Sequence, residues 1–198
     1  MPDILRPYIL SFIPIFVAID IIGTVPLYMS LVEKANRKNK DKVIFNALAT
    51  ATSVAILFML GGKLVLRLLG ISIPDFQIAG GALLFIIAVR LVMPGSHKSI
   101  SSEDDKDIGV FPLGTPLITG PAVLTTTLIM LDTFGLMPTF VALVLNMLFV
   151  WVVLFKADAI MDVIGSSGTN AFSKIMYILL AAIGVMMIRY GIHGAFLK

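Results

Sequence analysis

The chain has 198 residues, of which 58% are hydrophobic and 14% charged, and its formal net charge is +3 at pH 7. Soluble domains average about 45–50% apolar and 25% charged residues, so this composition indicates an integral membrane protein rather than a soluble or nucleic-acid-binding one. Because the chain has no cysteine, disulfides, thiolate metal sites and cysteine nucleophiles are excluded.

Six apolar segments follow one another along the chain. A helix needs about 20 mostly apolar residues to cross a bilayer. Segments of that kind lie at residues 8–29, 43–62, 74–93, 112–130, 137–156 and 172–193. The N-terminal residues lack the basic segment of a signal peptide, so we expect the first run to remain as a transmembrane helix. The prediction is an all-α membrane protein with six transmembrane helices.

The distribution of positive charge predicts the orientation of these spans. The loop between the first two spans, residues 33–42, holds five basic residues, the densest cluster in the chain. Cytoplasmic loops carry an excess of Lys and Arg, so this loop should face the cytoplasm. With six spans, ten of the 15 Lys and Arg residues then lie on the cytoplasmic side. We therefore expect a multi-pass protein of the cell membrane with both termini on the outer side.

Two stretches outside the spans bear on domain organisation. Leucines and charges at near-helical spacing in residues 61–70 predict an extension of the second span or an interfacial turn. Residues 95–107 are small, polar and charged, which favours a solvated linker over a metal site built on His97. We expect one membrane domain in three parts: a first three-helix repeat, a cytoplasmic linker and a second three-helix repeat, at residues 1–94, 95–111 and 112–198.

The first span is interrupted in its middle by Asp20. A carboxylate near the bilayer centre costs roughly 2.5–3.5 kcal/mol on insertion scales, so it usually faces protein or a wet cavity. Gly23 and Pro26, on either side of Thr24, weaken the helix at this point. On a continuous helix, Asp20, Gly23 and Thr24 would share one face because they stand at i, i+3 and i+4. The sequence therefore predicts a transport site in the first span.

The second half of the chain repeats this pattern. A shift of 95 residues aligns Asp20-x-x-x-Thr24-x-Pro26 with Thr115-x-x-x-Thr119-x-Pro121. Three spans per half give the halves opposite orientations, which is the inverted-repeat plan of many secondary transporters, whose sites lie where broken helices meet. The predicted fold is thus two inverted three-helix repeats with broken helices in spans 1 and 4. We assign the helix breaks to Pro26, Pro116 and Pro121.

Two broken helices that meet would form a polar pocket with one carboxylate, several hydroxyls and free backbone groups. Asp20 could hold an ammonium group or a coupling cation, and helix N-terminal amides could hold a carboxylate. The alternative is that Asp20 only forms hydrogen bonds within a packed bundle. Asn146, in the fifth span, is either a further ligand or a contact between helices. The predicted substrate- or ion-binding residues are Asp20, Gly23, Thr24, Thr115, Thr119, Gly120 and Asn146.

Signatures of the common enzyme classes are missing from the sequence. It contains no His-Glu-x-x-His, no Gly-x-Ser-x-Gly and no Gly-x-x-x-x-Gly-Lys-Ser/Thr motif. We therefore expect no enzymatic activity, no metal site and no cofactor, with a proton or sodium ion as the coupling ion to consider. The expected partners are a small solute and the lipid bilayer, no nucleic acid, and homo-oligomerisation stays open.

Three motifs resemble those of the MarC family, also called the UPF0056 or SnatA family. Residues 16–27 resemble its Asp-Pro-x-Gly-x-x-Pro element, 78–85 its third-span glycine pair and 116–121 its Pro-x-x-x-Gly-Pro motif. The resemblance covers essentially the whole chain and implies a bacterial or archaeal membrane protein with six spans, grouped with the LysE-type exporters. Some members of that family are described as transporters of small neutral amino acids. Ile21 stands where the family usually has proline, and Ala122 where it usually has glycine.

The residues and the resemblance together predict a secondary transporter of small solutes, foremost small neutral amino acids, that works by alternating access around a midplane site. Two alternatives remain open. An exporter of hydrophobic or cationic compounds would have aromatic pocket walls and would tolerate the loss of Asp20. A non-transporting membrane scaffold or regulator would need Asp20 only for packing.

Overall fold

The computed structural model describes residues 4–32, 40–93, 108–164 and 166–196, and within these ranges the protein is helical with no β-strand. Within these ranges, five helical stretches are long and apolar enough to cross a membrane, the first of them at Arg6–Val25, and there are six if the bent pair Gly109–Ile118 and Pro121–Phe134 is one span. This confirms an all-helical protein with five to six candidate spans. The elements are α1 (Arg6–Ile19), α2 (Ile21–Val32), α3 (Lys40–Leu69), α4 (Ile73–Val92), η3 (Gly109–Ile118), α6 (Pro121–Phe134), α7 (Leu136–Phe155), α8 (Ala157–Ile164) and α9 (Ser166–Phe196).

The predicted spans overlap these helices, and the differences lie at their ends. Helix α3 continues through residues 63–69, which confirms the expected extension of the second span. The short helix α8, which follows α7 after Lys156, was not predicted. Of the linker predicted at residues 95–111, residues 95–107 lie outside the described part of the chain, and residues 109–111 belong to η3.

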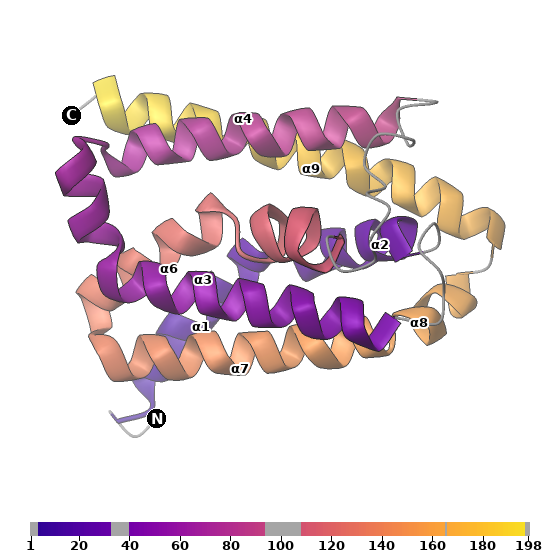
Figure 1. Cartoon of the computed structure of the whole chain (residues 1–198), viewed down its shortest axis with the longest axis horizontal. Coiled ribbons are helices and arrows are strands. Elements are labelled where there is room, and N and C mark those ends of the chain that lie inside the picture. Colours follow the sequence, from indigo (N-terminus) through magenta and orange to yellow (C-terminus); the bar gives the residue numbers. More distant parts are fainter. Residues whose placement is uncertain (1–3, 33–39, 94–107, 165, 197–198) are drawn as a thin grey trace.

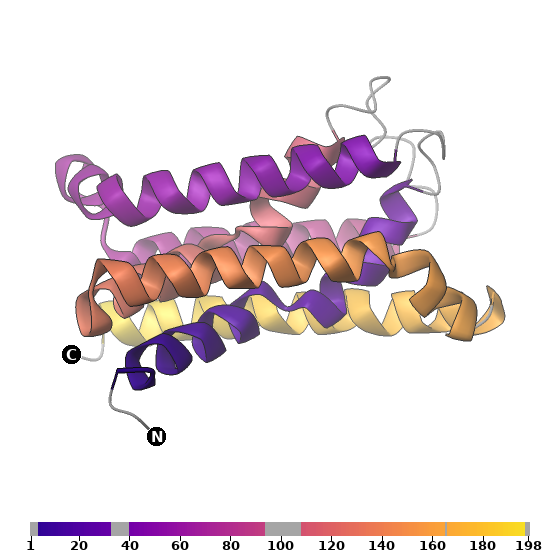
Figure 2. The ribbon, with the colours of Figure 1, turned by 90° about the horizontal axis from the view of Figure 1, so that it is seen from below.

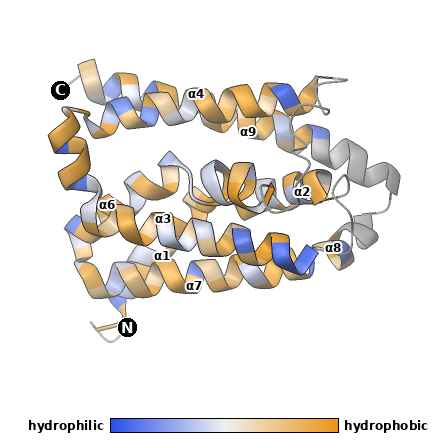
Figure 3. Ribbon diagram, in the orientation of Figure 1, coloured by the Kyte–Doolittle hydropathy of each residue, from blue (hydrophilic) through white to orange (hydrophobic). Residues whose placement is uncertain are grey.

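The long helices run side by side along the longest axis of the molecule (Figures 1 and 2). Helix α1 begins at the same end of the bundle at which α9 ends, and α3 begins at the opposite end. Most residues of the helices are hydrophobic (Figure 3), including outward-facing ones such as Leu57 and Leu68, which are 70% and 75% exposed. An apolar lateral surface of this extent suits lipid contact, since monomeric soluble proteins rarely expose large contiguous apolar patches.

Small residues allow α3 to approach η3 closely. Ala47, Ala51 and Ala55 form a fully buried stripe along α3 at a spacing of four residues. Opposite this stripe, a Cβ atom on Gly114 would lie 2.9 Å from the carbonyl oxygen of Ala47. Because apolar burial gives helices little reason to associate within lipid, close van der Waals packing between small residues is what holds such pairs together.

Helices α4 and α9 form the most extensive helix pair of the bundle and run antiparallel along one face (Figure 1). At their crossing, a Cβ atom on Gly81 would lie 2.5 Å from the carbonyl oxygen of Gly184. A capping box starts α4, because the Ser72 hydroxyl accepts from the Asp75 amide at 3.2 Å while the Asp75 carboxylate accepts from the Ser72 amide at 2.9 Å. The first turn of α4 is therefore fixed at the end of the bundle at which α9 ends.

Among the described residues, a salt bridge links two helices at each end of the bundle. At the end where α3 begins, Lys40 lies 2.5 Å from Asp158 on α8. At the opposite end, Lys63 pairs with Asp132 on α6. Exposed pairs of this kind contribute on the order of 0.2–1 kcal/mol each, so packing rather than charge holds the bundle together.

Candidate functional site at two helix breaks

The first helix break is centred on Asp20. Helix α1 ends at Ile19, and Asp20 adopts a left-handed conformation with φ 48° and ψ 60° before α2 begins. Aspartate and asparagine visit this region more readily than other side chains, because their short polar groups can form local hydrogen bonds. The expected single helical face through Asp20 and Gly23 is therefore replaced by two helix ends that meet at Asp20.

The side chain of Asp20 caps the start of α2. Its Oδ1 atom accepts a hydrogen bond from the backbone amide of Gly23 at 3.3 Å, which is the geometry of an N-cap. A Cβ atom on Gly23 would lie 2.5 Å from Oδ2 of the same carboxylate. Gly23 is thus needed for the close approach between the carboxylate and the helix start.

Thr24 stabilises the same break from one turn further on. Its buried hydroxyl donates to the carbonyl oxygen of Asp20 at 3.0 Å and reaches that of Ile19 at 3.4 Å. The Asp20 carbonyl also accepts the first backbone bond of α2, from the Thr24 amide at 3.0 Å, so the hydroxyl adds a second donor at the helix start. The Thr24 hydroxyl therefore has a structural use, and solute binding by Thr24 stays a prediction.

The second break lies between η3 and α6, which meet at an angle of 51°. Within η3, the backbone is extended at Phe111 and at Thr115, where φ is −137° and ψ is 125°. Helix α6 then starts with Pro121 in its first turn. Gly120 permits this sharp turn, because a Cβ atom there would overlap the carbonyl oxygen of Pro116.

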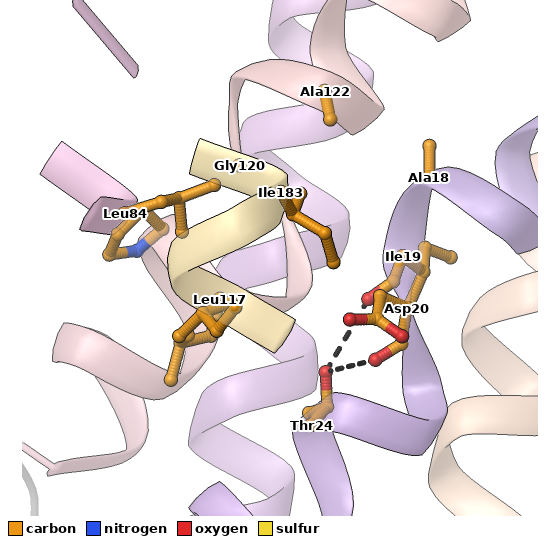
Figure 4. A pocket seen from close by; sticks show the side chains of 11 residues that line it. Ala18, Ile19, Asp20, Thr24, Leu84, Leu117, Gly120, Ala122 and Ile183 are labelled. Atoms are coloured by element: carbon orange, nitrogen blue, oxygen red, sulfur yellow. Dashed lines mark hydrogen bonds between the residues drawn. The ribbon is translucent and has the colours of Figure 1, made fainter. Parts of the chain in front are cut away.

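A small pocket, here called the junction pocket, lies between the two breaks (Figure 4). It encloses about 20 Å³, which is room for a single water molecule. Figure 4 shows Ala18 to Thr24 on one side of the pocket and Leu117, Gly120 and Ala122 on the other. Both breaks contribute to its wall: Asp20 and Thr24 come from the first break, and Pro116, Leu117 and Gly120 come from the second.

A much larger cavity adjoins the junction pocket, and Asp20 lines both. This Asp20 cavity has a volume of about 560 Å³, within the range of about 300–1,000 Å³ that is common for small-molecule sites. Helices α1, α4, α6 and α9 all contribute to its wall, which is mostly apolar. Its polar lining consists of Asp20, Gln77, Thr125, Thr126 and Tyr190.

The remaining predicted site residues lie apart from the Asp20 cavity. Thr115 lines a separate cavity of about 420 Å³, here called the Arg90 cavity, together with Leu83, Ile86, Arg90, Phe111 and Pro116. The Thr119 hydroxyl is fully buried and has no hydrogen-bond partner among the described residues. Pro26 lies inside α2, one turn after the first break.

Asn146 links two helices. Its side-chain amide donates to the carbonyl oxygen of Phe12 on α1 at 3.2 Å and to that of Ala142 at 2.9 Å. Its own Oδ1 atom is buried without a partner among the described residues. Asn146 therefore forms a hydrogen bond between α7 and α1, whereas its role as a ligand stays a prediction.

The structure adds residues that the sequence interpretation missed. Thr125 and Thr126 line the Asp20 cavity from α6, while Gln77 and Tyr190 line it from α4 and α9. The shift of 95 residues also aligns Thr125 with Ser30, so extending the comparison by one helical turn would have pointed to Thr125. Gln77 is a polar residue within the apolar span 74–93, which could have pointed to it, whereas nothing local distinguishes Tyr190.

Within the described ranges, no group of three or more His, Asp or Glu side chains could hold a metal ion. The Asp20 cavity instead offers one carboxylate, two threonines, an amide and a phenol among its polar side chains. This donor set suits a small cation or an ammonium group, since a carboxylate in an apolar wall attracts positive charge strongly.

Comparison with known proteins agrees with the membrane character of this site. Residues 5–196 match the sequence profile described as "MarC family integral membrane protein". The chain is similar to a UPF0056 membrane protein of Methanocaldococcus jannaschii, with 35% identity covering 98% of this chain and 90% of the relative. It is also similar to the UPF0056 membrane protein YhcE of Escherichia coli, with 31% identity covering 96% and 93%. No solved structure matches. The chain therefore belongs to the MarC family of integral membrane proteins.

Proposed function

We propose that the protein is a secondary transporter of small amino acids that works by alternating access around the two helix breaks. The observation that carries this proposal is the place of Asp20, a carboxylate at a helix break that borders a cavity of about 560 Å³. Inserting a carboxylate into the apolar part of a membrane costs free energy, and the carboxylates found there commonly line solute or ion pathways. The aspartate would bind the ammonium group of the solute or a coupling cation.

An inverted repeat is part of the proposal, and the packing supports it. At the shift of 95 residues, α3 corresponds to α7, α4 to α9, and the pair α1 and α2 to the pair η3 and α6. Helices α1 and α2 pack against α7, just as η3 and α6 pack against α3, and α4 packs against its own counterpart α9. Backbone departures also correspond, because Asp20 and Thr115 are both non-helical.

In the proposed mechanism, the conformational change takes place at the broken helices. In transporters with inverted repeats, access alternates when one repeat rocks against the other around a fixed site. Here the junction pocket has room for one water molecule only, so a solute in the Asp20 cavity is closed off at this point. We propose that rearrangement at Pro116 and Gly120 opens the passage toward the opposite end of the bundle.

The proposed orientation places both termini outside the cell membrane. Among the described residues, five Lys and Arg lie toward the end of the bundle where α3 begins and four toward the other end, and the segments 33–39 and 94–107, which join helices at the first end, hold five more. Basic residues favour the cytoplasmic side. The Asp20 cavity, which includes Gln77 near the start of α4 and Tyr190 near the end of α9, would then be nearer the outer face.

The test is counterflow of labelled glycine and alanine into liposomes that contain the purified chain, with and without proton and sodium gradients. We expect exchange by the parent protein and at least a tenfold loss, roughly the effect of 1.4 kcal/mol, in Asp20→Asn. Asparagine tolerates the left-handed conformation and caps helices as well as aspartate does, so this change isolates the charge. Asp41→Asn, at an exposed carboxylate in the first turn of α3, is the matched control.

The alternatives give different results in the same assay. An exporter of hydrophobic or cationic compounds would exchange such compounds but no amino acid, and Asp20→Asn would retain that exchange. A scaffold would exchange nothing, while Asp20→Asn would leave its thermal stability unchanged. Absence of amino acid exchange by the folded parent protein would refute the proposed function.

A further inference from the structure

A second cavity lies near the opposite end of α4 from the Asp20 cavity. Gln77 in the Asp20 cavity and Arg90 in the Arg90 cavity are 13 residues apart on the same helix, a rise of about 20 Å. Both volumes, about 560 and 420 Å³, suit small solutes. The two cavities therefore lie at different depths of the bundle.

The junction pocket lies between the two cavities and borders both of them. It shares Asp20 and Ala122 with the Asp20 cavity and shares Pro116 with the Arg90 cavity. Pro116 and the buried neighbours Leu84 and Leu117 thus form the partition between them.

The two cavities differ in the sign of their charge. Among the described lining residues, the Asp20 cavity has one carboxylate and no cation, while the Arg90 cavity has one guanidinium and no carboxylate. Arg90, an exposed residue near the end of α4, and the partly buried Thr115 are the polar residues of this wall, and apolar residues such as Leu83, Ile86 and Phe111 make up the rest. Arginine presents a planar fork of donors that matches a carboxylate, and low-dielectric walls strengthen such a contact.

We propose that the Arg90 cavity is a second solute site, on the far side of Pro116 from Asp20, which binds the carboxylate group of a small solute. That this cavity lies on a transport route rests on the proposed function, whereas the binding of a carboxylate group in it does not depend on that function. A zwitterionic amino acid would meet a carboxylate in one cavity and a guanidinium in the other. An arginine that merely extends its head group to the membrane surface would need neither the cavity nor Thr115.

The absence of native cysteine makes a labelling test direct. Ile87→Cys places a thiol in the wall of the Arg90 cavity, and Thr126→Cys places one in the wall of the Asp20 cavity. Val92→Cys is the matched control, because Val92 lies on α4 beyond Arg90 and is exposed outside the cavity. Each variant is labelled with a membrane-impermeant maleimide in right-side-out and in inverted membrane vesicles.

We expect Ile87→Cys to react in inverted vesicles and Thr126→Cys in right-side-out vesicles. Alanine and propionate should slow the reaction of Ile87→Cys, by roughly tenfold at ten times their dissociation constant, whereas ethylamine should not. Ethylamine and alanine should protect Thr126→Cys, and nothing should protect Val92→Cys. Adding Arg90→Gln should abolish protection by propionate, and Arg90→Lys should retain part of it because the charge remains.

Several results would overturn the proposal. These are reaction of both cavity thiols from the same face, failure of propionate to protect Ile87→Cys, or protection that survives Arg90→Gln. Protection that follows phosphatidylglycerol in reconstituted vesicles, and not propionate, would assign the cavity to an anionic lipid and refute a solute site. Propionate protection without alanine counterflow would support the anion site while refuting transport, so the two failures are distinguishable.

Discussion

Replacing Gly80 with alanine should destabilise the protein, because Gly80 on α4 lies directly against Pro121 at the start of α6. A Cβ atom on Gly80 would overlap the ring of Pro121. Overpacking of this kind costs about 1–3 kcal/mol. The upper part of that range applies here, because a proline ring at a helix start cannot rotate away from the contact.

The net effect is smaller, since alanine has the higher helix propensity. That gain is about 0.8–1 kcal/mol per residue. Subtracting it leaves a destabilisation of about 1–2 kcal/mol, and 1 kcal/mol corresponds to about 2–4 °C in melting temperature for a chain of this size. We therefore expect Gly80→Ala to melt about 2–8 °C below the parent protein. The displaced start of α6 should also lower amino acid counterflow, because Thr125 and Thr126 line the Asp20 cavity from this helix.

The assay is thermal unfolding in detergent, followed through the fluorescence of Trp151, the only tryptophan of the chain. Scan rates are kept equal, because irreversible unfolding makes melting temperatures depend on the rate. Gly61→Ala is the control: a Cβ atom there meets nothing within 4 Å, so alanine should stabilise α3 by about 0.5–1 kcal/mol. If Gly80→Ala melts at or above the parent temperature, the close contact between α4 and α6 is refuted.

Three further predictions use the same melting assay. Thr119→Val should raise the melting temperature, because its buried hydroxyl has no partner among the described residues and such a group costs about 1–3 kcal/mol; a lower temperature would reveal a bond to buried water. Asn146→Leu should cost no more than about 0.6 kcal/mol, because removal of the buried Oδ1 atom, which has no partner among the described residues, offsets part of the lost contact with Phe12; a loss above about 2 kcal/mol would contradict a simple interhelical bond. Lys63→Ala should cost less than about 1 kcal/mol, since side chains of this pair are 49% and 54% exposed; a double-mutant cycle with Asp132→Ala measures the pair alone.

Hydropathy was sufficient to find the spans. Lipid favours long apolar helices whatever they pack against, so windows of about 20 residues locate them without knowledge of the fold. For the charged and leucine-rich stretch after Gly61, the near-helical spacing predicted an extension of the second span or an interfacial turn, and the structure has the extension. Helix α8 is only eight residues long, below the length that such windows detect.

The site was harder to predict, because a break changes where side chains point. The spacing of Asp20 and Thr115 at corresponding positions suggested one shared pocket, but their directions follow from local backbone angles: left-handed at Asp20 and extended at Thr115. These angles send the two side chains toward different cavities. The usual proline after the aspartate is Ile21 here, and the helix still ends at Ile19. A break at this position therefore needs no proline when an aspartate takes the left-handed conformation and caps the next helix.

The two cavities differ in the sign of their charge, so the two halves of the proposed repeat are not chemically equivalent. At the shift of 95 residues, Asp20 corresponds to Thr115 and Arg90 to Val185, so both charges come from the first half. Two chemically equal cavities would bind a solute equally on both sides, whereas these should differ in their preference for ammonium and carboxylate groups. A difference in affinity changes occupancy, but it cannot by itself move a solute against its gradient. Uphill transport through these cavities would therefore require a coupling ion, and Asp20 is the residue at the junction whose charge could bind one.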